Sequence, residues 1–417
     1  MHHFDYKDGV LHAEELSVPD LAARYGTPLY IYSTATLRRH FTAFDSAFDG
    51  LTHMTCYSVK ANGNLGVLKL LADMGAGMDI VSGGELHRAL AAGVPADKIV
   101  YSGVGKRASE IAEALDAGIL MFNVESMAEL ERIDEVAGAK GVTARISLRI
   151  NPDVDPKTHP YISTGMKKNK FGLDMEASRA AYQRAAELPN IEPVGMDCHI
   201  GSQLTTIEPF MEALDKILAF HDSLTDMGLD IRYLDLGGGL GIRYDAEEPP
   251  HPSEFGKALT ERLAGLPLTV ILEPGRVIAG NAGILVTQVV YTKSTPSKQF
   301  AIVDAAMNDL IRPALYQSFH GIGEVRQNGR PAQVVDVVGP ICESSDFLAR
   351  DRELPGLESG DLLAVYSAGA YGFTMSSQYN ARPRAAELLV DGDRAILARR
   401  RETYEDLVAL ELDGLKG

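Results

Sequence analysis

The stretch MTCYSVKANGNLGVLKLLADMGAGMDIVSGGELHRALAAG (54–93) alternates short apolar runs with amphipathic segments. MTCYSVK (54–60) and MDIVS (78–82) are typical of buried β-strands, because they are short, largely apolar and bounded by turn residues. NLGVLKLLADMG (64–75) and GELHRALAAG (84–93) carry apolar residues at spacings of three and four and end at glycine, as helices do. The stretch therefore predicts two consecutive strand–helix units.

The same alternation continues to about residue 280. Further helices are predicted at ESMAELERIDEVAG (125–138) and ASRAAYQRAAEL (177–188). Six more strands are predicted at IVYSG (99–103), LMFNVE (120–125), ARISLRI (144–150), VGMDCHI (194–200), RYLDLGG (232–238) and TVILEPG (269–275). Eight strands alternating with helices predict an α/β fold, a (β/α)₈ barrel of the TIM type over residues 36–280. A doubly wound open sheet is the alternative, although no G-x-G-x-x-G motif follows the first strand.

The rest of the chain has short strands between Pro, Gly and Asp turns. Strands are predicted at ILVTQVVYTKS (284–294), FAIVDA (300–305), AQVVDVVG (332–339), DLLAVYSAG (361–369), AELLVDG (386–392) and AILARR (395–400). This pattern predicts a β domain of the sandwich or barrel type in residues 281–417. VLHAEEL (10–16) and PLYIYS (28–33) are expected to complete it. Residues 1–35 would then join the β domain, with the barrel inserted within it.

Composition narrows the class of protein. The 417 residues carry a formal net charge of −17, which argues against nucleic acid or an anionic membrane as the main partner. Cys56, Cys198 and Cys342 lie far apart without metal-ligand spacing, so we expect no disulfide framework, no metal site and a reducing compartment. MHHFDYKDG (1–9) lacks an apolar signal region, and no apolar run approaches the ~20 residues of a membrane helix. We therefore expect a soluble, cytoplasmic protein.

Two polar residues end predicted barrel strands, where a barrel enzyme carries its active site. Lys60 ends the first strand, and burial there would lower its pKa and make a nucleophilic amine suited to a Schiff base. The alternative is a lysine whose stem packs on the strand while its ammonium group reaches solvent. His199 ends the sixth strand, where its imidazole either stacks on a planar cofactor or has a structural role.

Glycines follow the seventh strand at Gly237, Gly238, Gly239 and Gly241. Backbone N–H groups approach an anion closely where no side chain intervenes, so this run favours a phosphate cradle. A tight turn at the strand exit is the alternative, and it accounts for one or two glycines more readily than for four.

The eighth strand ends in Glu273-Pro274-Gly275-Arg276. The carboxylate and the guanidinium form either a structural ion pair or two ligand contacts, the acid to a ring nitrogen and the arginine to a carboxylate or phosphate. Together with Lys60, His199 and the glycines, they match what pyridoxal 5'-phosphate requires: a Schiff base, a flat ring, a phosphate and a pyridine nitrogen. The strand ends therefore predict an enzyme that uses this cofactor on an amino acid.

Three motifs of the predicted β domain also carry reactive groups. MNDLIRPALY (307–316) carries an Arg and a Tyr at helical spacing, PICESSD (340–346) a thiol beside acids, and GAYG (369–372) an aromatic hydroxyl between glycines. Each also has a structural interpretation, as a surface arginine, a buried cysteine and a core tyrosine.

Many motifs of this chain, in order, resemble the fold-type III pyridoxal-phosphate decarboxylases, and most closely the diaminopimelate decarboxylase family. The motifs are YSVKAN (57–62), SGGEL (82–86), HPYISTGMKKNKFG (159–172), HIGSQ (199–203), LGGGLGI (236–242), EPGR (273–276), MNDLIRPALY (307–316), CESSDFLA (342–349) and AYGF (370–373). They span nearly the whole chain. The resemblance implies a cofactor-binding barrel with a C-terminal β domain.

The resemblance also implies roles toward the cofactor. Lys60 would bind pyridoxal phosphate covalently, and His199 would stack on its ring. The other residues expected to bind the cofactor are Asp79, Ser202, Gly238, Gly239, Glu273, Gly275, Arg276 and Tyr371. Glu273 would keep the ring nitrogen protonated, so that the ring accepts the electrons that the departing carboxylate leaves behind.

Charged groups would hold the far end of the substrate. The residues expected to contact the substrate are Arg276, Arg312, Tyr316, Glu343 and Tyr371. Arg276, Arg312 and Tyr316 would bind its distal carboxylate, and Glu343 its distal ammonium group. Cys342 would return a proton to the substrate carbon, with water or the cofactor lysine as the alternative donor.

The implied reaction is decarboxylation of meso-2,6-diaminopimelate at its D-centre to L-lysine and CO₂, the last step of lysine biosynthesis. An ornithine or arginine decarboxylase is an alternative, but Arg276 and Arg312 would have no second carboxylate to bind there. An amino-acid racemase of the same fold is another alternative. Its ring nitrogen commonly faces an arginine, so Glu273 favours decarboxylation.

The resemblance further implies a head-to-tail homodimer in which Glu343 reaches the active site of the partner subunit. Two residues depart from those more common in the family, Ser345 in place of Gly and Met166 in place of Leu. Neither difference affects an expected role.

Overall fold

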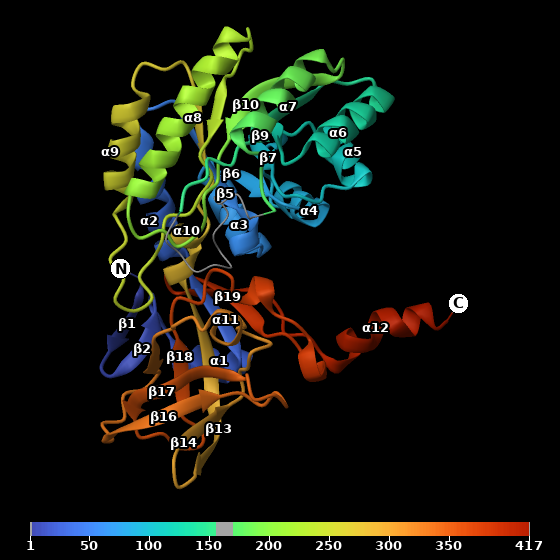
Figure 1. Cartoon of the computed structure of the whole chain (residues 1–417). Helices are drawn as coiled ribbons and strands as arrows, with labels where there is room; N and C mark the ends of the chain where they lie inside the picture. Colours follow the sequence, from blue (N-terminus) through green and yellow to red (C-terminus); the bar gives the residue numbers. More distant parts are fainter. Residues whose placement is uncertain (1, 156–169, 417) are drawn as a thin grey trace. The chain divides into compact units, whose positions relative to one another are not determined.

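The computed structural model describes residues 2–155 and 170–416, and the chain divides into two units (Figure 1). The β unit comprises Met1–Arg39, Tyr244–Ala246 and Ile278–Gly417. The barrel unit comprises His40–Arg243 and Glu247–Val277. The barrel unit is thus inserted into the chain of the β unit.

Eight parallel strands of the barrel unit form a closed barrel. They are β5 (His53–Ser58), β6 (Gly77–Ile80), β7 (Ile99–Tyr101), β8 (Met121–Val124), β9 (Ala144–Arg149), β10 (Ile191–Asp197), β11 (Tyr233–Asp235) and β12 (Thr269–Leu272). Around the ring the order is β10-β11-β12-β5-β6-β7-β8-β9, and β9 pairs with β10 to close it. Each strand overlaps one of the eight predicted runs. The predicted (β/α)₈ barrel is confirmed, and the open-sheet alternative is wrong because closure leaves no free edge.

Helices alternate with these strands and lie outside them (Figure 1). They are α2 (Thr34–Asp45), α3 (Leu65–Asp73), α4 (Gly83–Ala91), α5 (Ala108–Ala117), α6 (Met127–Lys140), α7 (Met175–Glu187), α8 (Glu208–Asp226) and α9 (Pro252–Leu263). Several begin at a residue whose side chain accepts a hydrogen bond from the first turn, such as Asn64, Ser82, Ser126 and Asp174. Local sequence therefore determines where these helices start.

The strand register places polar side chains in rows at the C-terminal ends of the barrel strands. Asp197 on β10 is paired with Arg149 on β9 and with Asp235 on β11. Ser58 on β5 is paired with Asp79 on β6. All five residues are buried, so the upper part of the barrel has a charged interior. Buried charges need partners, which makes this end of the barrel the place to look for a bound ligand.

The β unit is built on a nine-stranded sheet. Its strands are β4 (Leu29–Ser33), β13 (Gly283–Ser294), β14 (Gln299–Val303), β15 (Ile322–Glu324), β16 (Ala332–Val338), β17 (Phe347–Pro355), β18 (Leu362–Val365), β19 (Ala386–Asp391) and β20 (Arg394–Arg399). β4 pairs antiparallel with β13 and parallel with β19, so PLYIYS lies inside this sheet. VLHAEEL instead contributes β2 (Val10–Ala13) to a small sheet with β1 (Phe4–Lys7) and β3 (Leu16–Ser17). The predicted β-sheet domain, separate from the barrel, is confirmed.

The sequence pattern does not predict β17 or the C-terminal helix α12 (Tyr404–Gly414). β17 contains four consecutive charged residues, Arg350 to Glu353, three of them exposed, and this charged run hides its strand character. α12 buries none of its side chains and so lacks the apolar stripe that marks a packed helix. The β unit also contains α1 (Val18–Tyr25) and α11 (Arg312–Tyr316), and α10 (Arg276–Ala279) follows the barrel. In residues 2–155 and 170–416, no helix combines the length and the apolar character needed to cross a bilayer.

Candidate active site

Lys60 lies just after β5, in a short 3₁₀ turn (Val59–Ala61). Its Nζ donates a hydrogen bond to Asp79 Oδ2 at 2.5 Å, and Ser58 Oγ donates to the same oxygen at 2.7 Å. The carboxylate is fully buried and its Oδ1 has no partner among the described residues, whereas the Lys60 side chain keeps 35% of its surface exposed. The amine is thus tethered at the strand end instead of extending freely into solvent, as a covalent cofactor anchor requires.

His199 follows β10, and its imidazole is held by the glycine-rich turn. The N–H of Gly238 donates to His199 Nδ1 at 3.1 Å. Burial lowers the pKa of His199 well below its usual value, and the charges of Arg149 and Lys60 lower it further. The ring is therefore neutral with its proton on Nε2, and a flat neutral imidazole suits stacking on an aromatic cofactor.

The glycine turn is required by packing within the barrel unit. A Cβ on Gly238 would lie 2.2 Å from the carbonyl oxygen of Glu273, and one on Gly237 2.4 Å from His199 Nδ1. A Cβ on Gly239 would lie 2.5 Å from the carbonyl oxygen of Gly201. Close packing therefore accounts for several of these glycines. It supports the tight turn at the strand exit, which the sequence pattern favoured less than a phosphate cradle.

The same turn nevertheless fits an anion. The backbone N–H groups of Gly239 and Leu240 donate to no acceptor in the described part of the chain. Nearby, Arg276 is buried and its Nη2 donates to Ser202 Oγ at 3.1 Å. Donors without acceptors beside a buried cation are the chemistry that a phosphate needs. This fit rests on the donor set and not on the number of glycines.

Glu273 lies at the end of β12 and points into the charged interior of the barrel. Ser102 Oγ donates to its Oε1 at 3.4 Å, and Asn123 Nδ2 lies 3.5 Å from the same oxygen. Burial raises the pKa of Glu273 well above its usual value, and Asp235, Asp79 and Asp197 raise it further. A buried acid among acids fits a ligand that carries a protonated ring nitrogen.

Several residues of this interior were missed by sequence reasoning. They are Ser102, Asn123, Ser147, Arg149, Asp197 and Asp235. Arg149 Nη1 donates to Glu125 Oε1 at 2.7 Å, and Asn123 Nδ2 donates to Asp235 Oδ2 at 3.0 Å. The signal available in the sequence was a polar residue near the C-terminal end of an apolar run, as in FNVE, SLRI, MDCH and LDLGG.

In the β unit, Arg312 and Tyr316 both lie on the short helix α11. Arg312 is buried, its Nη1 donates to His320 Nε2 at 2.8 Å, and its guanidinium lies 4.5 Å from the ring centre of Tyr244. His320 Nδ1 in turn donates to the carbonyl oxygen of Tyr366 at 2.8 Å, so its Nε2 carries no proton, accepts from Arg312, and leaves the ring neutral. Arg312 is thus oriented without losing its positive charge. His320 and Tyr244 gave no sequence signal.

Cys342 and Glu343 lie in an exposed loop of the β unit. The Cys342 N–H donates to Asn380 Oδ1 at 2.9 Å. Glu343 accepts hydrogen bonds from Ser345 Oγ and, at 2.7 Å, from Tyr379 Oη. Both bonds lower the pKa of Glu343, so it is ionised at neutral pH. The serine that departs from the family pattern therefore supports the negative charge of Glu343.

Tyr371 has a left-handed backbone, with φ of +55°. A Cβ on Gly369 would lie 2.0 Å from the carbonyl oxygen of Ala279, and one on Gly372 2.4 Å from that of Ala368. Tight packing of the flanking glycines thus holds the tyrosine in a strained conformation. Such strain concentrates at functional sites.

The motif HPYISTGMKKNKFG falls largely on residues 159–169, which lie outside the described residues, as does Met166. Its end is described. The Gly172 N–H donates to Glu125 Oε2 at 2.8 Å, and the Arg149 guanidinium lies 4.8 Å from the ring centre of Phe171. The end of this motif is therefore attached to the charged interior of the barrel.

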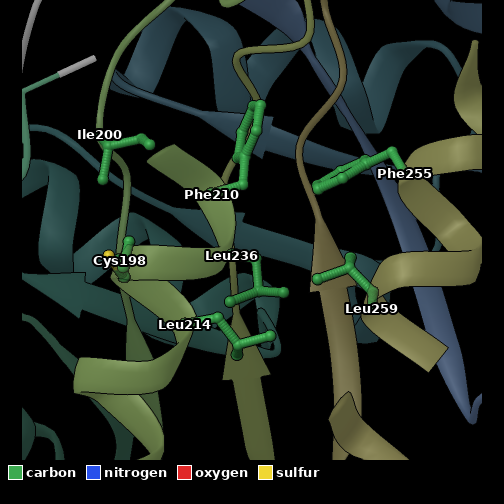
Figure 2. A pocket seen from close by; sticks show the side chains of 8 residues that line it. Cys198, Ile200, Phe210, Leu214, Leu236, Phe255 and Leu259 are labelled. Atoms are coloured by element: carbon green, nitrogen blue, oxygen red, sulfur yellow. The ribbon is translucent and has the colours of Figure 1, made fainter. Parts of the chain in front are cut away.

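A separate small cavity lies between the barrel and helices α8 and α9 (Figure 2). Its lining consists of Cys198, Ile200, Phe210, Ala213, Leu214, Leu236, Phe255 and Leu259. Burial raises the pKa of the Cys198 thiol, which therefore stays protonated. An apolar lining offers nothing to a phosphate or a carboxylate, so this cavity is distinct from the candidate active site.

Comparison with known proteins agrees with this chemistry. Residues 34–280 match the family model of the pyridoxal-dependent decarboxylases, pyridoxal binding domain. A diaminopimelate decarboxylase of Pseudomonas fluorescens is 57% identical over 409 residues, 98% of each chain, and one of Vibrio cholerae is 57% identical over 413 residues, 99% of each chain. The crystal structure of diaminopimelate decarboxylase from Helicobacter pylori complexed with L-lysine superposes with a TM-score of 0.92 at 45% identity, over 95% of this chain and 99% of that chain.

The closed barrel, the lysine at a strand end and the family match together define the class of protein: it is a pyridoxal-dependent decarboxylase. Within that class, the chain belongs to the diaminopimelate decarboxylase family. The enzyme is a carboxy-lyase, and its cofactor is pyridoxal 5'-phosphate, as predicted. The tethered amine of Lys60, the donors of the glycine turn and the buried acid Glu273 all fit that cofactor.

Proposed function

We propose that this chain decarboxylates meso-2,6-diaminopimelate at its D-centre, yielding L-lysine and CO₂ as the last step of lysine biosynthesis. The observation that supports the proposal is the arrangement at the barrel strand ends, where the amine of Lys60 is tethered to Asp79 and Glu273 is a buried acid, as one cofactor would need. The substrate follows from the family, because relatives 57% identical over nearly the full chain are diaminopimelate decarboxylases. L-lysine, the proposed product, is bound in the Helicobacter pylori structure.

We assign the cofactor contacts as follows from the residues described above. When bound, pyridoxal phosphate supplies an electron sink for the pair that the departing CO₂ leaves behind. Lys60 would hold the cofactor covalently beside Asp79, His199 would stack on its ring, and Glu273 would hold a proton at its ring nitrogen. The remaining contacts are assigned to Ser202, Gly238, Gly239, Gly275, Arg276 and Tyr371.

The substrate contacts follow from charge. Arg312 keeps its guanidinium charge beside neutral His320 and, with Arg276 and Tyr316, would bind the distal carboxylate. Glu343 is ionised and would bind the distal ammonium group. The exposed thiol of Cys342 is the assigned proton donor to the substrate carbon, and donation by water or the cofactor lysine is the alternative.

The direct test is CO₂ release by the purified enzyme with meso-diaminopimelate and, separately, with ornithine. We expect diaminopimelate to be much the better substrate, because ornithine has no second carboxylate for the arginines. Faster turnover of ornithine would refute the assignment. Release of no CO₂ with loss of optical purity would identify a racemase.

We further propose a homodimer with shared active sites. Helix α12 supports an additional partner surface, because Leu410 on this short helix is 87% exposed and Leu415, directly after it, is 82% exposed. If Glu343 acts in the partner's site, mixing inactive Lys60→Ala and Glu343→Ala subunits should restore part of the activity. No recovery after proven subunit exchange would contradict shared sites.

Two further assignments remain proposals. We place the domain boundaries at 36–280 for the barrel and at 1–35 with 281–417 for the β domain, supported by the family match over 34–280 and by the pairing of β4 with β13. We also propose a cytoplasmic location, supported by three free cysteines. Fractionation of cells that express the native chain tests the location.

A further inference from the structure

A hydrogen-bonded network joins four barrel strands around Glu273. Ser147 Oγ on β9 donates to Asn123 Oδ1 on β8 at 2.6 Å. This bond fixes the side-chain amide of Asn123, so that its Nδ2 faces the acids. Asn123 Nδ2 donates to Asp235 Oδ2 on β11 at 3.0 Å and lies 3.5 Å from Glu273 Oε1 on β12. All four residues are at most 5% exposed, so water does not screen them.

The two acids at the centre of this network share one amide donor. Asp235 Oδ1 accepts from the Gly237 N–H at 2.9 Å, and Asn123 Nδ2 lies 3.0 Å from Asp235 Oδ2 and 3.5 Å from Glu273 Oε1. Two ionised carboxylates that meet one amide in a buried site would repel each other strongly. The geometry therefore favours a carboxylic acid beside a carboxylate.

Charged groups from the surrounding strands act on this pair. Asp79 on β6 and Asp197 on β10 add negative charge, and Asp197 Oδ1 has no partner in the described part of the chain. Lys60, after β5, lowers the pKa of Glu273, and Arg149 on β9 also interacts with Glu273. The ends of strands β7 and β8 present the uncharged groups Ser102 and Asn123. Two acids and two cations thus surround the pair, and the repulsion between its own two carboxylates is what favours retention of a proton.

The position of the proton follows from the contacts of each acid. Burial raises the pKa of Asp235 to about 6, against hydrogen bonds from Gly237 and Asn123 that stabilise its charged form. Burial raises the pKa of Glu273 well above its usual value, and its donors are more distant, at 3.4 and 3.5 Å against 2.9 and 3.0 Å for Asp235. The closer donors assign the negative charge to Asp235 and the proton to Glu273.

We propose that Asp235, held by Asn123, is a positioning residue that keeps a proton on Glu273 for transfer to the ring nitrogen of the cofactor. The O–H bond of Glu273 breaks, an N–H bond forms on the ring, and Glu273 becomes a carboxylate while the ring gains one positive charge. No proton from solvent is required. The inference rests on the proposed contact between Glu273 and the ring nitrogen, and it extends that role to Asp235, Asn123 and Ser147.

Infrared spectroscopy of the full chain without cofactor tests where the proton resides. With ¹³C-labelled glutamate, the stretching band of a protonated glutamate carboxyl group should appear at neutral pH and be lost in Glu273→Gln. Asp235→Asn removes the neighbouring negative charge and adds an amide donor, so Glu273 should ionise and the band should weaken strongly. Asn123→Ala should move part of the proton to Asp235, so the glutamate band weakens while an aspartate band grows.

Calorimetry of cofactor binding gives a second readout that does not depend on activity. Binding heats are compared in two buffers of different ionisation enthalpy, at a pH where the free ring nitrogen is unprotonated. The wild-type chain supplies the ring proton itself. Asp235→Asn begins with ionised Glu273 and should take up about one more proton from solvent.

The matched control is Glu192→Gln, which removes an exposed acid from the same strand as Asp197 and should change neither readout. Circular dichroism and cofactor reconstitution establish that each variant is folded. An unchanged glutamate band and unchanged proton uptake in folded Asp235→Asn would overturn the proposal. Because neither readout involves substrate, such a result is distinguishable from failure of the proposed decarboxylation, which CO₂ release measures separately.

Discussion

The candidate site residues of the barrel unit and those of the β unit are held in different ways. Lys60, His199 and Glu273 stand at strand ends and contact a buried, acid-rich interior that shifts the pKa values of His199 and Glu273 far from their usual values. Cys342 and Glu343 stand in an exposed loop, where two hydrogen bonds lower the pKa of Glu343. Rigid burial suits groups that must hold one cofactor in one protonation state, whereas an exposed loop suits groups that meet a substrate or a partner.

Removal of the Lys60 amine gives the strongest test of this difference between the barrel unit and the β unit. Lys60→Ala should abolish the visible absorption of the bound cofactor and lower CO₂ release by roughly 10³-fold or more, because no other amine stands beside Asp79 in the described structure. Absorption spectra and CO₂ assays measure the two effects. Lys69→Ala is the matched control, since Lys69 is exposed on α3 and, within residues 2–155 and 170–416, pairs with Asp73 alone. A Lys60→Ala variant that keeps its turnover would contradict the assignment of Lys60 as the covalent anchor of the cofactor.

Arg312 is an informative exception, because it is a buried residue of the β unit. Arg312→Ala should raise the KM for diaminopimelate by about 10²-fold, since loss of one partner of a buried charge pair costs about 2–5 kcal/mol. The turnover number should fall less than the KM rises. Steady-state kinetics separate the two parameters, and Arg350→Ala, which removes an exposed arginine stacked on Phe347, is the control. An unchanged KM would exclude Arg312 from substrate binding.

Two cysteines allow the exposed loop and the buried barrel to be compared at one residue type. Cys342→Ser, in the exposed loop, should lower turnover by about 10²-fold and leave the unfolding free energy unchanged. Cys198→Ser places a hydroxyl beside the apolar cavity of Figure 2, and should lower stability by about 1–3 kcal/mol with little effect on turnover. Urea unfolding measures the stability of both variants, and CO₂ assays measure their turnover. If Cys342→Ser lowered stability and Cys198→Ser lowered turnover, the roles assigned to the two cysteines would be wrong.

The smallest effect is expected at the hydrogen bond between Tyr379 and Glu343. Tyr379→Phe removes a donor to the carboxylate, so the lowered pKa of Glu343 should rise toward its ordinary value. A carboxylate with a lowered pKa loses its charge only as the pH falls, so the effect of the substitution on KM should be seen at acidic pH. We expect KM to rise by about twofold near pH ~4.5 and to stay unchanged near pH ~8. An equal rise at both values would indicate a steric effect instead.

Sequence reasoning located most of the candidate site residues but missed the buried polar residues that hydrogen-bond to them. Lys60, His199 and Glu273 were visible because a polar residue that ends an apolar run has few structural explanations. Asn123, Asp235 and Ser147 also end or interrupt apolar runs, but their importance depends on which strands are neighbours. β8 and β11 are not adjacent in the barrel, and their side chains meet only across its interior. The glycine turn shows the reverse case, since close packing within the barrel unit explains glycines that the sequence pattern assigned mainly to phosphate.

By itself, the sequence determined the alternation of strand and helix, the β-rich character of residues 281–417 and the residue types at the strand ends. These properties depend on local periodicity, turn residues and capping, which act over a few neighbouring positions. Only the tertiary structure decided that the sheet closes, that β4 joins strands more than 250 residues away along the chain, and that Asn123 reaches both Asp235 and Glu273. Burial and neighbouring charges set a pKa, and both arise only when distant segments pack together.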